Sequence, residues 1–422
     1  MSLSDRSVLF APAHYVTGRD VGGSELQWAF DIVSQGARRF GTVDAVLCDL
    51  RNGSFPANVR VHEVDKGRDA NYYLPRESAL FVARYTRAAL RVCRRAAPSL
   101  LHHVFPWGAR TFNPLILWRG TPFGMPASTR VVIGPLQEPI FGHATVEEEG
   151  YRFRADAQAR HDASARALRD ASARPGLQFG PLEPPLRALC RATLRKADAI
   201  IALTNGARDY VRALGVETPI HVVPAGARVD AYPAREPSAN GAPLRVICLS
   251  YLIARKRIEL TVQAIARVRA RGKDVTLTIA GDGPERARLE TLIGELRLDG
   301  AVRMTGYVDH DQTPALLANA DLFVTMSDIE TLPAAVIEAM AAGLPVISTR
   351  TEGAVELVED GVTGSLVPFD DAQALAAQIE RFADDAPMRT ACGLAARRRA
   401  QQDLSWDAIG TRYAEIYESV LG

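Results

Sequence analysis

Several features that identify common protein classes are scarce in this sequence. Its five cysteines are spread from Cys48 to Cys392 without the spacing of metal ligands, so we predict neither a metal site nor a disulfide scaffold. Lysine and arginine number 50 against 49 acidic residues, and the net charge of +1 disfavours a protein that binds mainly nucleic acid. No apolar run approaches the length of about 18 residues that spans a membrane, and residues 1–15 lack the apolar centre of a signal peptide. We therefore expect a cytoplasmic protein.

The chain does contain enough apolar sequence for two folded domains. Hydrophobic residues make up 47% of its 422 positions and charged residues 23%, as in ordinary soluble globular proteins, and a chain of this length is expected to form more than one core. Predicted strands alternate with predicted helices, beginning with a strand at 7–10, a helix at 26–39 and a strand at 43–47. This alternation predicts an α/β fold with parallel, doubly wound sheets.

Two stretches interrupt the alternation. Residues 143–180 contain few large apolar side chains, so we expect an exposed helix or a mobile segment there rather than core. Residues 231–243 hold several prolines and no periodicity, which predicts a linker, and the alternation resumes at residue 244. We therefore predict one domain at 1–232, a second at 243–404, and a final helix at 405–422.

The segment from Glu330 to Glu338, E-T-L-P-A-A-V-I-E, contains the most informative pattern. Pro333 suits the first position of a helix, and that helix would start at the carboxyl end of a predicted strand at 322–325, where open α/β sheets bind anions. One carboxylate precedes the helix, and the other lies about 7 Å along its axis at about 1.5 Å per residue, which is close to the length of a diphosphate. Carboxylates accept hydrogen bonds from pairs of sugar hydroxyls, so a nucleotide-sugar site is one interpretation. The other is that both glutamates only complement the helix dipole.

Three further segments each leave two interpretations open. Arg255-Lys256-Arg257 lies between a predicted strand and a predicted helix, either as a phosphate clamp or as a solvated basic turn. Gly22-Gly23 precedes a helix and either approaches a phosphate or sugar closely or forms a tight turn. His102-His103 ends a short buried strand, where a histidine either deprotonates or orients a hydroxyl, or is a hydrogen-bonded strand-end residue.

Two polar turns are assigned no ligand. Gly281-Asp282-Gly283-Pro284 lacks the third glycine of a dinucleotide-binding loop, so we predict a turn that leads into a helix. Asp309-His310-Asp311 has the acidic pair of a metal site but lies in a polar loop, and we predict a solvated turn.

Taken in order, the motifs of the C-terminal half resemble those of the retaining family-4 glycosyltransferases, which have the two-Rossmann-domain architecture called GT-B. The resemblance is strong from Lys196 to the C-terminus and weaker before it. It includes the E-x7-E motif between Glu330 and Glu338 and the segment A-M-A-A-G-L-P-V that follows. The other matching segments are Val223-Pro224-Ala225-Gly226, Ile279-Ala280-Gly281-Asp282-Gly283-Pro284, Gly306-Tyr307-Val308, Glu356-Leu357-Val358 and Gly361-Val362-Thr363-Gly364.

This resemblance implies an architecture and a set of binding roles. It implies two Rossmann-like domains that face a cleft, with the acceptor bound by residues 1–232, the nucleotide sugar bound by 243–404, and the last helix packed back onto the first domain. It makes Glu338 the ribose-binding carboxylate, Glu330 a catalytic group beside the transferred sugar and Lys256 the cation that stabilises the diphosphate. With them we place His103 as a catalytic candidate and, as donor-binding residues, Gly22, Gly23, Arg255, Thr331, Leu332 and Pro333.

The sequence departs from the family pattern at three places. Tyr251 stands where the family usually has an arginine ahead of the lysine, so either Arg255 or Arg257 supplies that charge or the phosphates are held less strongly. Thr331 replaces the glycine that usually follows the first motif glutamate. Gln137-Glu138-Pro139 replaces the glycines found in a subgroup with paired histidines, which leaves the acceptor-side roles open.

We therefore predict a retaining, metal-independent glycosyltransferase that uses no cofactor. Its donor would be a UDP- or GDP-linked sugar, and its acceptor a hydroxyl of a glycan, a glycolipid or a small precursor. The alternative, suggested by Tyr251, is a non-catalytic nucleotide-sugar-binding partner of another transferase. A nicotinamide-dependent dehydrogenase is disfavoured by the incomplete glycine fingerprint.

One helix suggests a weak peripheral contact with the inner face of a membrane. Its arginines at 84, 87, 91, 94 and 95 lie beside Leu80, Phe81 and Leu90, a composition that meets anionic lipid in some proteins. The other interpretation is a solvated helix face.

Overall fold

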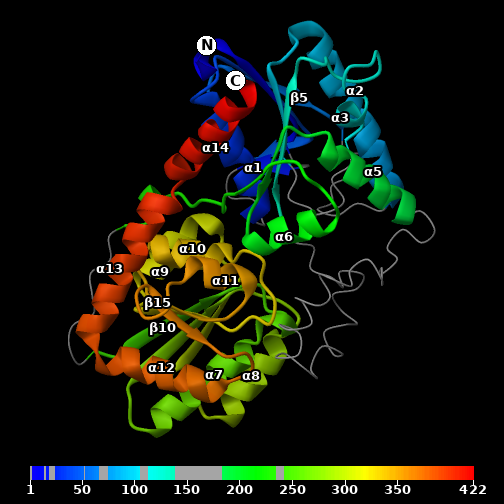
Figure 1. Cartoon of the computed structure of the whole chain (residues 1–422). Coiled ribbons are helices and arrows are strands. Elements are labelled where there is room, and N and C mark those ends of the chain that lie inside the picture. Colours follow the sequence, from blue (N-terminus) through cyan, green and yellow to red (C-terminus); the bar gives the residue numbers. More distant parts are fainter. Residues whose placement is uncertain are drawn as a thin grey trace. The chain divides into compact units, whose positions relative to one another are not determined.

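The computed structural model of this chain describes residues 2–13, 16–18, 24–51, 53–65, 75–104, 113–137, 183–233 and 242–422. These residues form two compact units: unit 1 holds the described residues up to 225 together with 406–422, and unit 2 holds 226–405. Each unit is a parallel sheet covered by helices (Figure 1). The predicted α/β class with two doubly wound parallel sheets is confirmed.

Residues 226–233 are held within unit 2, and the domain bounds at 1–232 and 243–404 stay a prediction. The backbone N–H of Ala227 donates to the carbonyl of Leu404 at 2.8 Å, and the Arg397 guanidinium donates to the carbonyl of Tyr232 at 3.0 Å. Residues 234–241, the greater part of the predicted linker, and the segment 143–180 lie outside the described residues.

A seven-stranded sheet forms the centre of unit 1, in the order β5-β3-β1-β6-β7-β8-β9. Every neighbouring pair runs parallel, as buried runs of β-branched and aliphatic residues predict. The strands are β1 (Ser7–Ala13), β3 (Thr42–Leu47), β5 (Val59–Glu63), β6 (Leu100–Val104), β7 (Arg130–Leu136), β8 (Ala199–Ala202) and β9 (Ile220–Val222). Two short strands that the sequence analysis missed, β2 (Val16–Gly18) and β4 (Asp49–Arg51), pair with each other.

Helices cover both faces of this sheet, because successive strand residues point to opposite sides. Leu9 and Leu101 belong to one buried cluster with residues of α2, α3, α5 and α6. Their neighbours face the other way: Phe10 lies under α1 at Gly36, and His102 contacts α14. The helices of unit 1 are α1 (Ser24–Ala37), α2 (Pro75–Ala96), α3 (Pro114–Leu117), α5 (Glu183–Arg195), α6 (Asn205–Ala213) and α14 (Trp406–Leu421).

The last helix, α14, packs on α1 and on the sheet of unit 1. Its Tyr417 hydroxyl hydrogen-bonds to Nδ1 of His102 at 2.8 Å, and the Asp407 carboxylate accepts hydrogen bonds from Arg38 at 2.5 Å and Gln35 at 3.2 Å. Gly410 permits the close approach of α1, since a β carbon there would lie 2.3 Å from Oε1 of Gln35. The C-terminal residues are therefore an integral part of unit 1.

Unit 2 is built on a six-stranded parallel sheet in the order β12-β11-β10-β13-β14-β15. Its strands are β10 (Leu244–Leu249), β11 (Val275–Ala280), β12 (Val302–Gly306), β13 (Leu322–Thr325), β14 (Val346–Thr349) and β15 (Gly364–Val367). The strands predicted between 244 and 349 are all present, with ends that differ by about one residue. One face packs against α7, α8 and α12 in a single buried cluster.

The helices of unit 2 include several that the sequence analysis left unassigned after residue 350. Among its described residues, the helices are α7 (Ile258–Ala270), α8 (Arg286–Glu295), α9 (Thr313–Ala318), α10 (Ala334–Ala341), α11 (Glu352–Leu357), α12 (Ala372–Asp384) and α13 (Ala386–Asp403). Within the described ranges, no helix is long and apolar enough to cross a membrane.

Candidate functional site

The sheet of unit 2 has a point at which the order of its strands reverses. β10 lies between β11 and β13, so the chain moves outward on one side of β10 and later returns to the other side. In open α/β sheets, such a switch point leaves a crevice at the carboxyl ends of the strands in which ligands bind. β10 is followed by the 3-10 turn η6 (Ala254–Lys256), and β13 is followed by the residues that lead into α10. The predicted basic triplet and the first motif glutamate therefore meet at the same edge.

Glu330 is the point at which these two segments touch. Nζ of Lys256 donates a hydrogen bond to Oε2 of Glu330, and Nη1 of Arg255 lies 3.4 Å from the same oxygen. Arg255 also donates to the carbonyl of Ile329 at 2.9 Å. The side chains of Lys256 and Glu330 are only 15% and 16% exposed. The structure thus brings together three of the predicted site residues.

The charges around Glu330 determine its protonation state. Burial by itself raises the pKa of this carboxyl, but the positive charges of Lys256 and Arg255 outweigh burial, and hydrogen bonds from Lys256 and Ser327 act in the same direction, so its pKa lies below its ordinary value. Glu330 is therefore an ionised hydrogen-bond acceptor at neutral pH. Lys256 keeps further N–H donors after its contact with Glu330, because an ammonium group has three.

The residues between Glu330 and α10 are fixed by the connection from β14 to α11. Oγ1 of Thr349 donates to the carbonyl of Ser327 at 2.6 Å. Gly353 lies so close that an added β carbon would be 2.2 Å from the carbonyl oxygen of Thr331 and 2.8 Å from Cα of Leu332. Both of these predicted donor-binding residues are buried, so it is their backbone that is held in place next to the helix start.

The start of α10 differs slightly from the prediction. Pro333 was expected at the first helical position with Thr331 or Leu332 as the cap. Instead Pro333 itself is the cap, with extended backbone angles, and the helix begins at Ala334. Proline has no side-chain acceptor, so the cap residue makes no side-chain hydrogen bond to the start of the helix. The helix ends at Ala341, before Gly343 with a φ of +77°.

Glu338 contacts a residue that the sequence analysis assigned to a solvated turn. Nε2 of His310 lies 3.1 Å from Oε1 of Glu338, and the two side chains are 26% and 14% exposed. Only its neighbours Asp309 and Asp311 are exposed as predicted. The prediction was wrong for His310 because η7 (His310–Gln312) follows β12 at the same sheet edge as α10. Because parallel strands end at the same edge of a sheet, this shared edge was the signal in the sequence that could have placed His310 near Glu338.

Tyr232 is a second residue near Glu338 that the sequence analysis missed. Its side chain is buried, and its pKa is raised first by burial and then by the negative charge of Glu338, against the opposing effect of Arg228. The Tyr232 carbonyl is held by Arg397, which also donates to the carbonyl of Ala341 at the end of α10 at 2.6 Å. Through Arg397, Tyr232 is therefore connected to α10, the helix that carries Glu338.

Arg257, one of two candidates for the charge lost at Tyr251, is fully engaged elsewhere. Its backbone is left-handed, with a φ of +48°, and its guanidinium pairs with Glu259 at 2.8 Å, with Asp328 at 3.3 Å and with Asp370. Burial lowers the pKa of Arg257, but the three carboxylates outweigh this effect and raise it. Arg255, which contacts Glu330, is the candidate that faces the site.

The Gly281-Asp282-Gly283-Pro284 segment is a turn, as predicted, and it supports the loop that carries the basic residues. Gly281 and Gly283 have φ values of +136° and +156°. An added β carbon at Gly281 would lie 1.9 Å from the carbonyl oxygen of Ser250. The backbone N–H of Leu252 donates to the carbonyl of Asp282 at 2.9 Å. Only glycine fits such an approach, so the turn fixes the start of the segment that ends at Lys256.

In unit 1, the paired histidines are buried. His102 is fully buried between the Gly134 carbonyl, at 2.9 Å from its Nε2, and the Tyr417 hydroxyl. Nδ1 of His103 accepts a hydrogen bond from Nδ2 of Asn113 at 2.9 Å. Burial lowers the pKa of both histidines to about 3. These contacts fit the strand-end interpretation, and a catalytic role for His103 stays a prediction.

Asn113 determines which nitrogen of His103 carries the proton. Its Oδ1 accepts from the backbone N–H of Leu115 at 3.0 Å, and its Nδ2 donates to the carbonyl of Ala11 at 3.2 Å. The amide orientation is therefore fixed with the NH₂ group toward His103. A neutral imidazole that accepts at Nδ1 must carry its proton on Nε2, so His103 can offer an N–H donor there. Gly22 and Gly23 lie outside the described residues.

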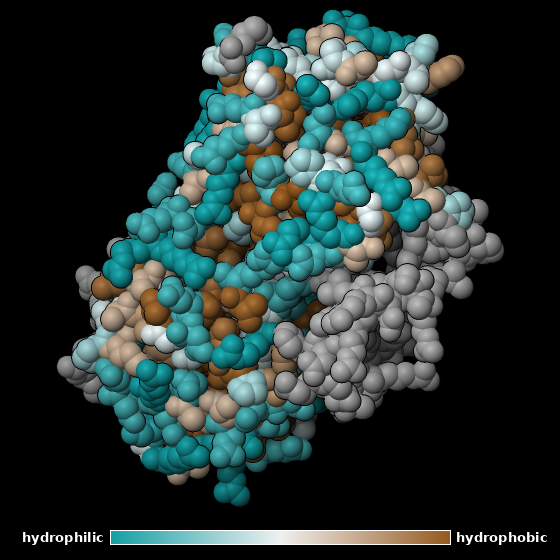
Figure 2. All heavy atoms as spheres, viewed as in Figure 1, coloured by the Kyte–Doolittle hydropathy of each residue, from teal (hydrophilic) through white to brown (hydrophobic). Residues whose placement is uncertain are grey.

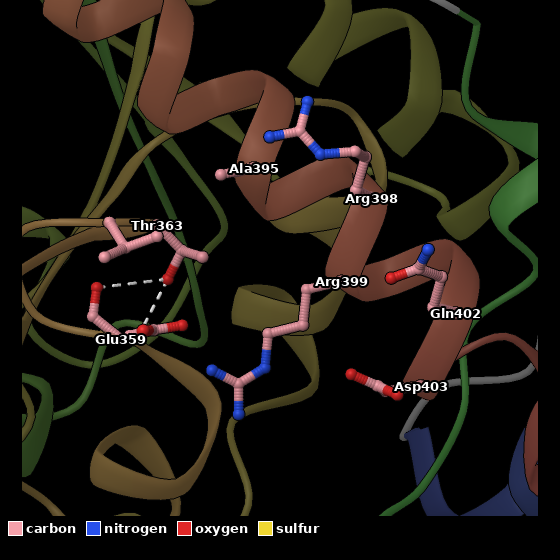
Figure 3. A pocket seen from close by; sticks show the side chains of 8 residues that line it. Glu359, Thr363, Ala395, Arg398, Arg399, Gln402 and Asp403 are labelled. Atoms are coloured by element: carbon pink, nitrogen blue, oxygen red, sulfur yellow. Dashed lines mark hydrogen bonds between the residues drawn. The ribbon is translucent and has the colours of Figure 1, made fainter.

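A shallow hollow of about 530 Å³ lies on unit 2 between the turn at 359–363 and α13 (Figure 3). Arginines and acidic residues both line it, among them Glu359, Arg398, Arg399 and Asp403. None of the predicted site residues lines this hollow. Among the described residues, no group of three histidine, cysteine, aspartate or glutamate side chains is placed to hold a metal ion.

Comparison with known proteins identifies two family models in the chain. Residues 27–226 match the glycosyl transferase 4-like domain, and residues 234–399 match the glycosyl transferases group 1. The putative colanic acid biosynthesis glycosyltransferase WcaL of Salmonella typhimurium is 32% identical over 234 residues, which cover 54% of this chain and 58% of that protein. The match thus spans somewhat more than half the length of this relative.

Solved structures share the fold over nearly the whole chain. The sucrose-phosphate synthase of Thermosynechococcus elongatus superposes with a TM-score of 0.66 at 19% identity, covering 98% of both chains. HepE of Anabaena, solved in complex with UDP and glucose, superposes with a TM-score of 0.61 at 20% identity, covering 98% of this chain and 100% of that one. At these identities the likeness concerns the fold, which is the two-domain GT-B fold.

Proposed function

Because the chain belongs to the glycosyltransferase superfamily and has its two-domain GT-B fold, we propose that it transfers a sugar from a nucleoside-diphosphate donor to a hydroxyl group, with retention of configuration and without a metal ion. The observation that carries the proposal is the contact of Lys256 and Arg255 with Glu330 at the switch point of the unit 2 sheet. Two cations and one ionised acceptor meet where a diphosphate and a sugar would both need partners.

In this proposal the leaving diphosphate binds between the two cations and the start of α10. Lys256 stabilises the negative charge that grows on the phosphate as the sugar departs, and Arg255 adds a second, bidentate donor. The first backbone N–H groups of α10, to which Pro333 offers no side-chain acceptor, would add further donors. The cations and backbone donors would do the work that a metal ion does in other transferases.

Glu330 and Glu338 would bind the two ends of the donor. Glu330, ionised and held by Lys256, accepts hydrogen bonds from hydroxyls of the transferred sugar. Glu338 accepts from the ribose hydroxyls, and His310 holds its Oε1, so that the remaining lone pairs point in a defined direction. We therefore assign His310 as a positioning residue for the ribose site. UDP and GDP sugars are the donors we propose, since both have a ribose and a diphosphate.

The proposed acceptor is a hydroxyl of a glycan, a glycolipid or a small precursor, and His103 would orient it. With its proton on Nε2, His103 donates a hydrogen bond and does not remove a proton. The proton of the attacking hydroxyl would then pass to the departing phosphate on the same face of the sugar, which is the retaining course. We propose that this reaction takes place on the cytoplasmic side.

The position of Arg255 bears on the non-catalytic alternative. That alternative was suggested by Tyr251, which stands where the family usually has an arginine. Arg255 lies 3.4 Å from Glu330, which supports the proposal that it supplies, beside Lys256, the positive charge of the missing arginine.

The first test is thermal unfolding with UDP, GDP and ADP in turn. A nucleotide at 100 times its Kd adds about 2.7 kcal/mol of stability, or about 5–10 °C for a domain of this size. We expect a shift with UDP or GDP that Glu338→Ala removes, and release of the free nucleotide from the matching sugar donor when acceptor is supplied. A shift without turnover on any hydroxyl acceptor would refute catalysis, and the absence of any shift would refute the donor site.

A further inference from the structure

Unit 1 carries a surface on which arginines surround exposed hydrophobic side chains. We name it the α2–α5 surface, because its residues come from α2, from the turn that follows α3, and from α5. Its members are Arg87, Arg91, Arg94, Arg95, Trp118, Phe123, Leu189 and Arg191.

The exposed hydrophobic residues on this surface have no counterpart elsewhere on the described part of unit 1. Phe123 is 74% exposed, Trp118 49% and Leu189 42%, and among the described residues of this unit no other large hydrophobic side chain is exposed. Isolated exposed hydrophobic residues are common, but a group confined to one layer of helices is typical of an interaction surface.

Hydrogen bonds and packing join the three elements into one surface. Arg94 donates to the carbonyl of Pro122 at 3.2 Å, next to Phe123, and Nζ of Lys196, just after α5, donates to the carbonyl of Leu117 at 2.6 Å. All three helices contribute to the same buried cluster and so cover the same face of the sheet (Figure 1). In the same view, tan and brown residues interrupt the hydrophilic surface of this region (Figure 2).

The charge of this surface is positive. On α2, Arg87, Arg91, Arg94 and Arg95 are exposed at helical spacing, and no described residue forms an ion pair with them. Asp198, the nearby carboxylate, already binds Arg119 at 2.6 Å and Arg130 at 3.1 Å. A second carboxylate, Asp65, binds Arg84 of α2 at 3.0 Å, so both acidic groups are paired and the four exposed arginines of α2 are available to an external anion.

We propose that the α2–α5 surface docks this chain on a bilayer that contains anionic phospholipid. Trp118 and Phe123 would enter the boundary between headgroups and acyl chains, where aromatic side chains are favoured, while the arginines contact lipid phosphates. From Arg87 to Arg95 the cations extend over about 12 Å at 1.5 Å per residue. An extended plane of negative charge fits this row better than one small anion does. The proposal does not depend on the proposed sugar transfer.

Sedimentation of the full chain with vesicles tests the proposal. We expect the chain to pellet with an equal mixture of phosphatidylglycerol and phosphatidylcholine, but not with phosphatidylcholine alone, and to be released as salt is raised. Each arginine of α2 changed to glutamine should weaken binding about fivefold. The matched control is Arg267→Gln, an exposed arginine on α7 of unit 2.

The hydrophobic part of the surface is tested separately. Phe123→Ser should weaken binding to the mixed vesicles, whereas Leu394→Ser, at a residue 54% exposed on α13, should not. In a chain that carries Trp107→Phe, a blue shift of tryptophan fluorescence on binding should disappear when Trp118→Phe is added, because the two remaining tryptophans, Trp28 and Trp406, are buried. The proposal is overturned if no vesicle pellets the chain, if the control variants lose as much binding as the surface variants, or if the chain binds single-stranded RNA but not the mixed vesicles.

Discussion

Replacing Lys256 by methionine tests the central contact of the proposed donor site. Methionine keeps the length and apolar stem of lysine but removes its charge, so Glu330 retains only Arg255 at 3.4 Å among its charged partners. If the ammonium stabilises the departing diphosphate, its loss should lower kcat by about 10²–10³, as removal of one transition-state donor typically does, or about 2.7–4 kcal/mol. Binding of the nucleotide alone should weaken much less, because the charge on the phosphate is smaller in the ground state.

Lys256→Met should also lower the free energy of unfolding, and the burial of the ion pair determines by how much. Removing one partner of a buried ion pair costs about 3–5 kcal/mol. Here Arg255 remains, and the Glu330 side chain is 16% exposed, so we expect a smaller loss of about 1–3 kcal/mol in urea unfolding. As a control, Lys273→Met breaks an exposed pair with Asp384, at side-chain exposures of 38% and 56%, and should cost less than about 1 kcal/mol.

A double variant separates the two effects. Adding Glu330→Gln to Lys256→Met removes the carboxylate that was left without its main partner, so most of the lost stability should return. Activity should not return, because neither the cation nor the sugar-binding carboxylate is restored. The assay is the initial rate of transfer with the donor whose nucleotide gives the largest thermal shift, together with urea unfolding of each variant.

The pH dependence of stability gives a further readout of this contact. Because the folded pKa of Glu330 lies below its ordinary value, its stabilising contribution is present above the ordinary value and is lost as pH falls through the folded pKa. In Lys256→Met the folded pKa rises, so the loss should begin at a higher pH. Our assignment of Lys256 is refuted if kcat and nucleotide affinity fall by the same factor, or if neither changes.

Three other substitutions or conditions have defined outcomes. His310→Ala should weaken UDP or GDP binding about five- to tenfold with little change in kcat, because it frees the Glu338 carboxylate to rotate. The control is Asp311→Ala, at an exposed neighbour, and equal effects of the two substitutions would contradict the assignment of His310 as a positioning residue. Tyr417→Phe should destabilise unit 1 by about 1–3 kcal/mol in urea unfolding, because it leaves Nδ1 of buried His102 without its donor; an unchanged midpoint would contradict it. Since the pKa of His102 and that of His103 are both about 3 in the folded chain, stability should fall as pH is lowered from about 6.5 toward 3, by up to about 1.4 kcal/mol per pH unit for each histidine. His102→Gln should remove its share of this slope, and an unchanged slope would show that His102 is not buried in neutral form.

The strand–helix alternation could be predicted because it depends on local sequence. The strands of both sheets are short runs of β-branched and aliphatic residues, such as Val346–Thr349, and glycine or proline marks their ends. The same reasoning located the helix that carries Glu338, with an error of one residue at its start. That error arose because Pro333, which suits both positions, has the extended backbone of a cap rather than helical angles.

The choice between Arg255 and Arg257 could not be made from sequence. The two residues are separated by one position in a 3-10 turn, and adjacent side chains there point in different directions. What decides between them is the placement of Asp328 and Asp370, which come from other connections of the sheet and bind Arg257. The pairing of His310 with Glu338 was hidden for a similar reason, since it requires the order of strands in the sheet and not only their existence.

The fixed tautomer of His103 connects the fold of unit 1 to the chemistry proposed for this chain. Asn113 holds Nδ1 of His103 as an acceptor, and burial lowers the pKa of this imidazole to about 3, so at neutral pH the ring offers only the N–H at Nε2. A side chain in this state can orient a hydroxyl oxygen but cannot take its proton. The proton of an attacking hydroxyl must then go to another base, and in a transfer from a nucleotide sugar the departing phosphate oxygen gains negative charge at the moment it is needed. The burial of His103 therefore argues against this histidine as the base, and in the proposed transfer the departing phosphate takes the proton instead.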